Sequence, residues 1–298
     1  MDKRIKICLK LFVSLVILCL LFFTVDVNTC LKTLSHINIS LFFLLVLIYL
    51  TGQVISAVKW KIIAQKLGFH NTLFNFIKYY FKGMFYNSFL PTNVGGDIMK
   101  IAYLKKDCNQ ENSIEKAFVS VLADRISGVF VLVILAFAGI LAVHNLNNMI
   151  KFFVCLAFLL SLLSIFLILV FGKKNFKHDI INKIIGYNKL FLDKDMFKIL
   201  FLSLVFHILV IILHVLIGKA LHLTINPFYY LILYPLSALA ASLPVSLNGI
   251  GIKEASYMYL LAQVSILPSQ ALIFVLCWNL VILINSLIGA IFFIEKMD

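Results

Sequence analysis

The sequence predicts an all-α polytopic membrane protein with about six full spans, two oppositely oriented re-entrant helical hairpins and an inverted repeat. Hydrophobic residues make up 62% of the 298 residues and charged residues only 13%, whereas soluble domains are roughly 45–50% apolar. Apolar runs of spanning length recur along the chain, and two turns rich in Pro, Asn and Gly interrupt shorter ones: LPTNVGGD at 90–97 and LPVSLNGIG at 243–251. We expect one integral membrane domain, 1–298.

Six apolar runs approach the roughly 17–25 residues that a spanning helix needs. They lie at 9–25, 39–58, 117–143, 150–171, 199–221 and 270–294. The first follows MDKRIK and resembles a signal peptide, but no small-x-small cleavage site follows it, so we expect a retained span, with a cleaved signal as the alternative. The shorter apolar pieces lie at 74–90 and 96–104, and at 228–243 and 251–264.

The net charge of +13 follows the positive-inside pattern of membrane proteins and does not indicate nucleic-acid binding. If the N-terminus is cytoplasmic, all 26 Lys and Arg fall in cytoplasmic segments except Lys32, Arg125, Lys151, Lys219 and Lys253. This pattern predicts a multi-pass plasma (inner) membrane protein with both termini in the cytoplasm. Because 59–82 and 100–116 are both basic and therefore cytoplasmic, 74–104 must enter the membrane from the cytoplasmic side and return to it. By the same argument 199–221 ends outside and 270–294 runs inward, so 228–264 must enter from the opposite side.

The two turns belong to an internal repeat with an offset of about half the chain. Leu90-Pro91 aligns with Leu243-Pro244, and an acid and a base lie close after each turn. We therefore divide the chain into halves 1–149 and 150–298. Inverted repeats with broken helices near the midplane are typical of transporters. The alternative is that Pro and Gly merely kink ordinary spans and that the apolar sequences align by chance.

The turns and the intramembrane charges are the candidate binding site. A helix that starts inside the membrane presents free N–H groups, and glycine lets an anion approach them. A charged residue at membrane depth costs roughly 2.5–3.5 kcal/mol on the insertion scale, so these groups are either ion-paired for structure or line a polar cavity. The predicted substrate-binding residues are Asn93, Gly95, Gly96, Asp97, Lys100, Asp124, Arg125, Asn248, Gly249, Gly251, Lys253 and Glu254.

No catalytic, metal or cofactor motif is found: there is no GxSxG, HExxH or P-loop, and the six cysteines form no CxxC pair. His207 and His214 share a helix face about 10 Å apart, too far for one metal ion, and are interpreted as packing residues. We therefore expect neither an enzyme nor a cofactor.

Three motifs resemble those of the lysylphosphatidylglycerol synthase transmembrane family, also called flippase-like domain proteins. They are FLPTNVGGDIMKIAYL, AFVSVLADRISG and SLPVSLNGIGIKEASYMYLLA, and in order and spacing the resemblance covers about residues 75 to 294. The resemblance implies an inner-membrane protein that moves lipids between leaflets, without the large soluble aminoacyl-transfer domain of the two-part enzymes. Lys100 and Lys253 stand where the family pattern has arginine, and lysine binds phosphate as a point charge.

The leading hypothesis is a lipid translocator for a phospholipid or lipid-linked envelope intermediate, with an anionic or zwitterionic phosphate headgroup held in a midplane polar cavity. The alternatives are a membrane-embedded enzyme of lipid or envelope metabolism and an accessory subunit of an envelope enzyme. The expected partners are membrane lipids and no nucleic acid. Whether the chain forms a homo-oligomer is left open.

Overall fold

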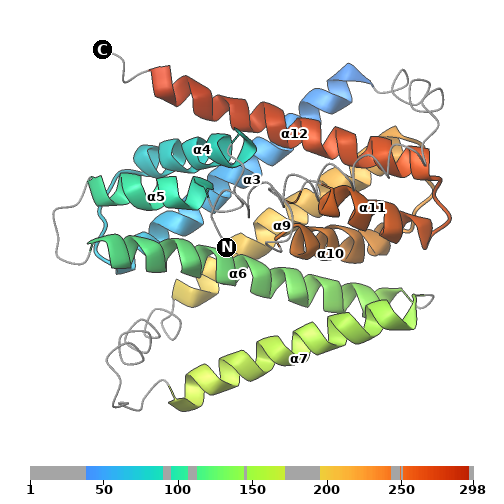
Figure 1. The fold of residues 1–298 in the computed structure, drawn as a ribbon, viewed down its shortest axis with the longest axis horizontal. Coiled ribbons are helices and arrows are strands. Elements are labelled where there is room, and N and C mark those ends of the chain that lie inside the picture. The colour runs from blue at the N-terminus through green and yellow to red at the C-terminus, as the bar shows by residue number, and fades with distance from the viewer. Residues whose placement is uncertain are drawn as a thin grey trace, which may run out of the picture.

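The computed structural model describes residues 38–89, 95–106, 113–143, 146–171, 195–242, 249 and 251–294. All regular elements within these ranges are helices (Figure 1). The expected first span at 9–25 lies outside the described residues, as do Asn93 and Asn248.

Four helices in the described ranges are long and apolar enough to cross a membrane. They are α3 (Ile39–Lys66), α6 (Ser113–Ala142), α9 (Asp195–Ala220) and α12 (Pro268–Ile294). Each coincides with a predicted span. The run predicted at 150–171 is also helical, as α7 (Asn148–Phe171), but its apolar stretch with described side chains, Asn148–Ser164, is shorter than a span.

Shorter helices flank both predicted turns. They are α4 (Leu73–Phe89) and α5 (Gly95–Lys106), then the 3-10 turn η2 (Pro227–Tyr229) with α10 (Tyr230–Ser242), and α11 (Ile252–Ala262). The order of one long helix, two short helices and one long helix thus occurs twice, once on each side of α7. In Figure 1, α4 and α5 lie beside one half of α6, and α10 and α11 lie toward its other half.

The first long helices of the two halves run antiparallel and pack along each other. Lys66 at the end of α3 forms an ion pair of 3.0 Å with Asp195 at the start of α9. A shallow hollow of about 330 Å³ at these helix ends is lined by Ile62, Gln65, Lys66, Asp195 and Lys198. The predicted cytoplasmic ends of α3 and α9 therefore lie together.

The predicted span 39–58 ends too early, so Lys59 lies within a helix and not in a loop after it. α3 continues past the predicted end at 58 to Lys66, and the Lys59 side chain is buried. The reason is the aromatic core that surrounds the next residue: Trp60 is fully buried and packs edge-on against Phe76 of α4, with ring centroids 5.0 Å apart. This packing keeps the last two turns of α3 helical and inside the protein.

Each pair of short helices packs against a long helix from the other half of the chain. α4 contacts α12, and α10 contacts α6. The approach of α4 to α12 requires Gly289, because a Cβ atom there would overlap the carbonyl oxygen of Phe81. The two halves are therefore interleaved.

Candidate functional site

Five ionisable residues gather where α3, α5, α6 and α9 meet. We call this group the charged cluster; it consists of Lys59, Asp97, Lys100, Asp124 and Arg125. It holds three cations and two carboxylates, and therefore has one excess positive charge. Four of its members are buried, and only Arg125 is exposed.

Arg125 pairs with Asp97, the first acidic residue of α5. The Arg125 Nε donates to Asp97 Oδ2. The Arg125 side chain is 48% exposed, whereas that of Asp97 is only 8% exposed. A guanidinium has five N–H donors, and the described residues offer this one no other hydrogen-bond acceptor. Exposed apolar side chains, Leu122 and Ile126, lie beside Arg125 on α6. Arg125 is thus a half-exposed (half-open) cation flanked by exposed apolar side chains on α6.

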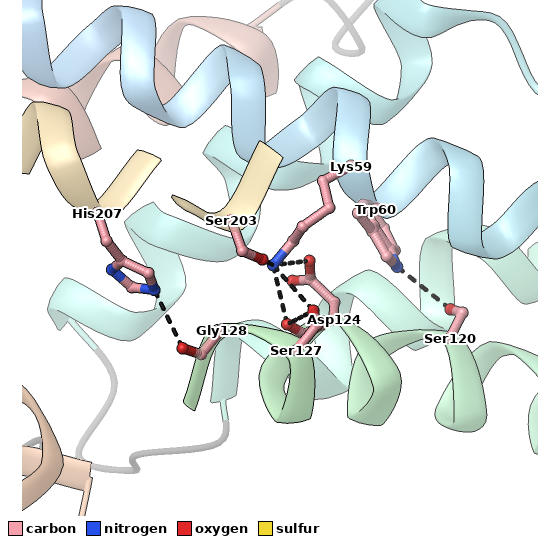
Figure 2. A network of polar contacts seen from close by, with 8 residues as sticks. All are labelled: Lys59, Trp60, Ser120, Asp124, Ser127, Gly128, Ser203 and His207. Carbon is pink, nitrogen blue, oxygen red and sulfur yellow. Dashed lines mark hydrogen bonds and ion pairs between the residues drawn. The ribbon is translucent and has the colours of Figure 1, made fainter. Parts of the chain in front are cut away.

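Lys59 forms an ion pair with Asp124, and both side chains are buried, at 7% and 8% exposed. The Lys59 ammonium lies 3.0 Å from Asp124 Oδ1 (Figure 2). It donates hydrogen bonds to the Asp124 carbonyl oxygen at 3.0 Å, to Ser127 Oγ at 3.3 Å and to Ser203 Oγ at 3.1 Å. Because Lys59 and Asp124 lie before α7 and Ser203 after it, this contact joins the two halves of the chain.

Lys100 is held by aromatic rings. Its ammonium lies 3.6 Å from the centroid of Tyr80 and 5.3 Å from that of Trp60. Trp60 is fixed in turn by a hydrogen bond from its Nε1 to Ser120 Oγ at 3.2 Å (Figure 2). No carboxylate of the described residues lies within ion-pair distance of Lys100. Ring faces attract a desolvated cation by about 2 kcal/mol, so Lys100 remains in the cluster without neutralising an acid.

The two glycines that begin α5 lie in close packing. The Gly96 N–H donates to Asn87 Oδ1 of α4 at 2.7 Å. A Cβ atom at Gly96 would overlap the Gly83 carbonyl oxygen. Gly95 is buried beside it in the first turn of α5. Gly96 therefore brings α4 and α5 together, and its N–H already has an acceptor within the protein.

At the second turn, the backbone N–H of Gly251 is bound by the nearby Glu254 carboxylate. Gly249 and Gly251 have φ angles of +75° and +86°, a conformation that glycine adopts readily. The Gly251 N–H donates to Glu254 Oε2 at 2.7 Å, and Asn279 of α12 donates to Glu254 Oε1 at 2.8 Å. Lys253 lies next to Glu254 and is half-buried. No hydrogen bond or ion pair among the described residues joins Lys253 or Glu254 to the charged cluster, so the structure does not bring the two predicted groups into direct contact.

Two histidines of α9 extend the polar contacts of Ser203 along that helix. His207 Nε2 lies 3.2 Å from the Gly128 carbonyl oxygen, and Nδ1 lies 2.9 Å from the Tyr234 hydroxyl. A carbonyl only accepts, so Nε2 bears the hydrogen, and the neutral ring accepts at Nδ1 from Tyr234. His214 is held likewise between Val210 and Tyr257. Both rings make packing and hydrogen-bond contacts within the helix bundle.

Sequence reasoning missed Lys59 and Ser203 as residues of the candidate site. A signal was present, since Gly52, Ser56 and Lys59 recur at helical spacing on the buried face of α3. Small residues on one face favour close contact between membrane helices. A lysine in phase with them is expected to lie inside the bundle.

Comparisons with known proteins agree with the motifs. The family described as the lysylphosphatidylglycerol synthase TM region matches residues 7–289. The UPF0104 membrane protein PH1989 of Pyrococcus horikoshii is 26% identical over 140 residues, which are 46% of this chain and 42% of that protein. The chain thus spans less than half the length of this curated relative. No solved structure matches.

Proposed function

The chain belongs to the lysylphosphatidylglycerol synthase transmembrane family, and from this premise we propose that it is a lipid translocator. It moves a phospholipid or a lipid-linked envelope intermediate between the leaflets of the inner membrane. It acts on membrane lipids with an anionic or phosphate-bearing headgroup, and it does so without chemical catalysis. The observation that supports this proposal most strongly is the half-open Arg125 on α6.

A guanidinium on an apolar membrane surface is costly unless a polar partner meets it. Even the lenient insertion scale assigns about 2.5–3.5 kcal/mol to a central arginine. Asp97 offsets part of this cost from the buried side. Because the Arg125 side chain is 48% exposed, a lipid phosphate could accept its unused N–H donors in pairs, since guanidinium and phosphate match in a bidentate geometry. The excess positive charge of the charged cluster favours an anion there.

The proposed membrane arrangement has about six spans and two re-entrant hairpins. The pairs α4–α5 and α10–α11 are the hairpins, entering from opposite faces, and the halves 1–149 and 150–298 are related by inversion. The recurring helix order and the antiparallel packing of α3 and α9 support this arrangement. Both termini lie in the cytoplasm. Irregular backbone at the hairpin tips is tolerated at membrane depth where protein or a wet cavity surrounds it.

Leaflet-specific quenching of a fluorescent lipid, in liposomes that contain the pure protein, tests the function. We expect the wild-type protein to exchange labelled phosphatidylglycerol between leaflets, and Arg125→Ala to abolish the exchange. Lys198→Ala is the matched control, because Lys198 is an exposed cation paired with Asp195 at a helix end. Equal exchange by empty liposomes and by the protein would refute the proposal. A new lipid species, found by mass spectrometry after incubation, would indicate an enzyme instead.

A further inference from the structure

The oxygen atoms around the Lys59 ammonium form a cation-binding arrangement. Four oxygens lie within 3.3 Å of Nζ: Asp124 Oδ1, the Asp124 carbonyl oxygen, Ser127 Oγ and Ser203 Oγ. An ammonium has three N–H donors. All three are used by the carbonyl and the two hydroxyls, so the carboxylate contributes charge to the site but receives no hydrogen from Lys59.

One oxygen of the Asp124 carboxylate, Oδ1, is consequently left without a hydrogen bond. Asp124 Oδ1 is buried and accepts none from the described residues. Buried carboxylates are normally both paired and hydrogen-bonded, because burial removes the water that would solvate the charge. Here the ionised form is supported by charge alone, from Lys59 in direct contact and from Lys100 and Arg125 at longer range. A proton added at Oδ1 would break no hydrogen bond.

Other ionisable groups near Asp124 already have fixed partners. On its own helix, Arg125 is bound to Asp97 of α5. Lys100, also of α5, lies over the ring of Tyr80 from α4. The Tyr80 side chain itself is hydrogen-bonded with Ser56 of α3. From α9 and α10, His207 and Tyr234 bind each other, since His207 accepts from Tyr234 and donates to the Gly128 carbonyl oxygen. Asp124 is the group of this set with an unused buried acceptor atom.

We propose that Asp124 is an exchangeable proton-binding site, and that Lys59 is its fixed countercharge, so that lipid movement is coupled to proton binding. This inference rests on the proposed function. A proton from water adds to Oδ1 and converts the carboxylate to a neutral carboxyl group, while Lys59 keeps its three hydrogen bonds. The excess positive charge of the charged cluster rises from one to two. An anionic phosphodiester headgroup offsets the added charge, and the proton leaves when the headgroup does.

The position of the site explains how the proton would affect movement. Lys59 and Asp124 belong to the first half of the chain and Ser203 to the second. Loss of the carboxylate charge leaves Lys59 joined to α6 and to α9 only by hydrogen bonds to neutral oxygens. Protonation therefore weakens the electrostatic attraction between Lys59 of α3 and Asp124 of α6. Because the same ammonium also binds Ser203 of α9, protonation also affects the contact between the two halves.

The test uses the full chain reconstituted in liposomes with an imposed pH gradient. Exchange of fluorescent phosphatidylglycerol is compared with and without the gradient for wild type, Asp124→Asn, and Asp195→Asn as the control for a paired carboxylate at a helix end. One pH unit is a tenfold change in proton activity, so we expect up to about a tenfold change in the wild-type rate. Asp195→Asn should respond equally, and Asp124→Asn should not respond.

A second readout follows the proton without lipid movement. Infrared difference spectra between low and neutral pH should contain a protonated-carboxyl band that Asp124→Asn lacks. If Asp124→Asn does not fold, the double change Lys59→Met with Asp124→Asn, which leaves no unpaired charge, replaces it in both measurements. A gradient response in this neutral variant equal to that of wild type would overturn the proposal.

The outcomes separate the coupling from the function. Wild-type exchange that is the same with and without the gradient would overturn proton coupling and leave lipid movement standing. Absence of wild-type exchange, with the Asp124 band present, would refute the translocator function and the coupling with it. Absence of the band from the wild type would overturn the proton site directly.

Discussion

Replacement of Lys59 by methionine should destabilise the protein more than any single change at the Arg125–Asp97 pair. Lys59→Met leaves the buried Asp124 carboxylate without a countercharge, and breaking a buried pair in this way costs roughly 3–5 kcal/mol. Both side chains of this pair are under 10% exposed, so solvent offers little relief. At up to about 2–4 °C per kcal/mol, the range for chains of about 150–250 residues, the melting temperature should fall by at most roughly 6–20 °C.

Arg125→Ala provides the comparison. Arg125 is 48% exposed, and Asp97 lies in the first turn of α5, where the helix dipole offsets about 0.3–1 kcal/mol for an anion. We therefore expect a smaller loss, about half that of Lys59→Met. Thermal unfolding in detergent, followed by tryptophan fluorescence, measures both variants. Trp60 reports directly, because it adjoins Lys59 and lies in the core formed with Phe76.

The double change Lys59→Met with Asp124→Asn should recover most of the lost stability, since no charge remains unpaired. Two results would refute this reasoning. One is a fall of less than 2 °C for Lys59→Met, which would mean that Asp124 is solvated or takes up a proton when Lys59 is absent. The other is a double variant as unstable as the single one, which would mean that Lys59 acts through its contacts with the two serines and not through its charge.

Two further predictions concern packing and topology. Gly96→Ala should prevent folding, because its Cβ would overlap the Gly83 carbonyl oxygen, whereas Gly128→Ala should fold, because its Cβ would lie at ordinary contact distances from neighbouring side-chain atoms; gel filtration of the two purified variants checks this, and equal yields would contradict it. Cysteines introduced at the exposed positions 105 and 147 should react with membrane-impermeant reagents from the cytoplasmic and the outer side, respectively. Labelling of both from the same side would exclude the proposed topology.

The breaks between the short helices could be predicted from sequence because their cause is local. Proline lacks an N–H, and glycine tolerates backbone angles that other residues avoid. The predicted pieces therefore end within two residues of α4, α5, α10 and α11. Glycine was expected to leave backbone N–H groups free for a ligand, and whether such a group is free could not be predicted from the local sequence. Asn87 reaches Gly96 from a neighbouring helix, and no local pattern encodes that contact.

The pairing of charges could not be predicted for a geometric reason. Asp124 and Arg125 are adjacent in sequence, but successive residues of an α-helix point about 100° apart, at 3.6 residues per turn. They consequently meet different helices: Asp124 faces Lys59 of α3, and Arg125 faces Asp97 of α5. Counting Lys59 with the cytoplasmic lysines hid the first pair. A charge count records how many cations flank a span but not the helix face on which each one lies.

The packing of α4 against α12 has a consequence for how the chain is made. Synthesis runs from the N-terminus at about 5–20 residues per second, and α4 precedes α12 by almost two hundred residues. During that interval of tens of seconds or less, the surface of α4 around Phe81 lacks Gly289 and its neighbours. The packing surface of α4 is therefore completed only when the final helix arrives. A chain truncated before α12 should be recognised as unfinished and degraded, even though every residue of the charged cluster is present.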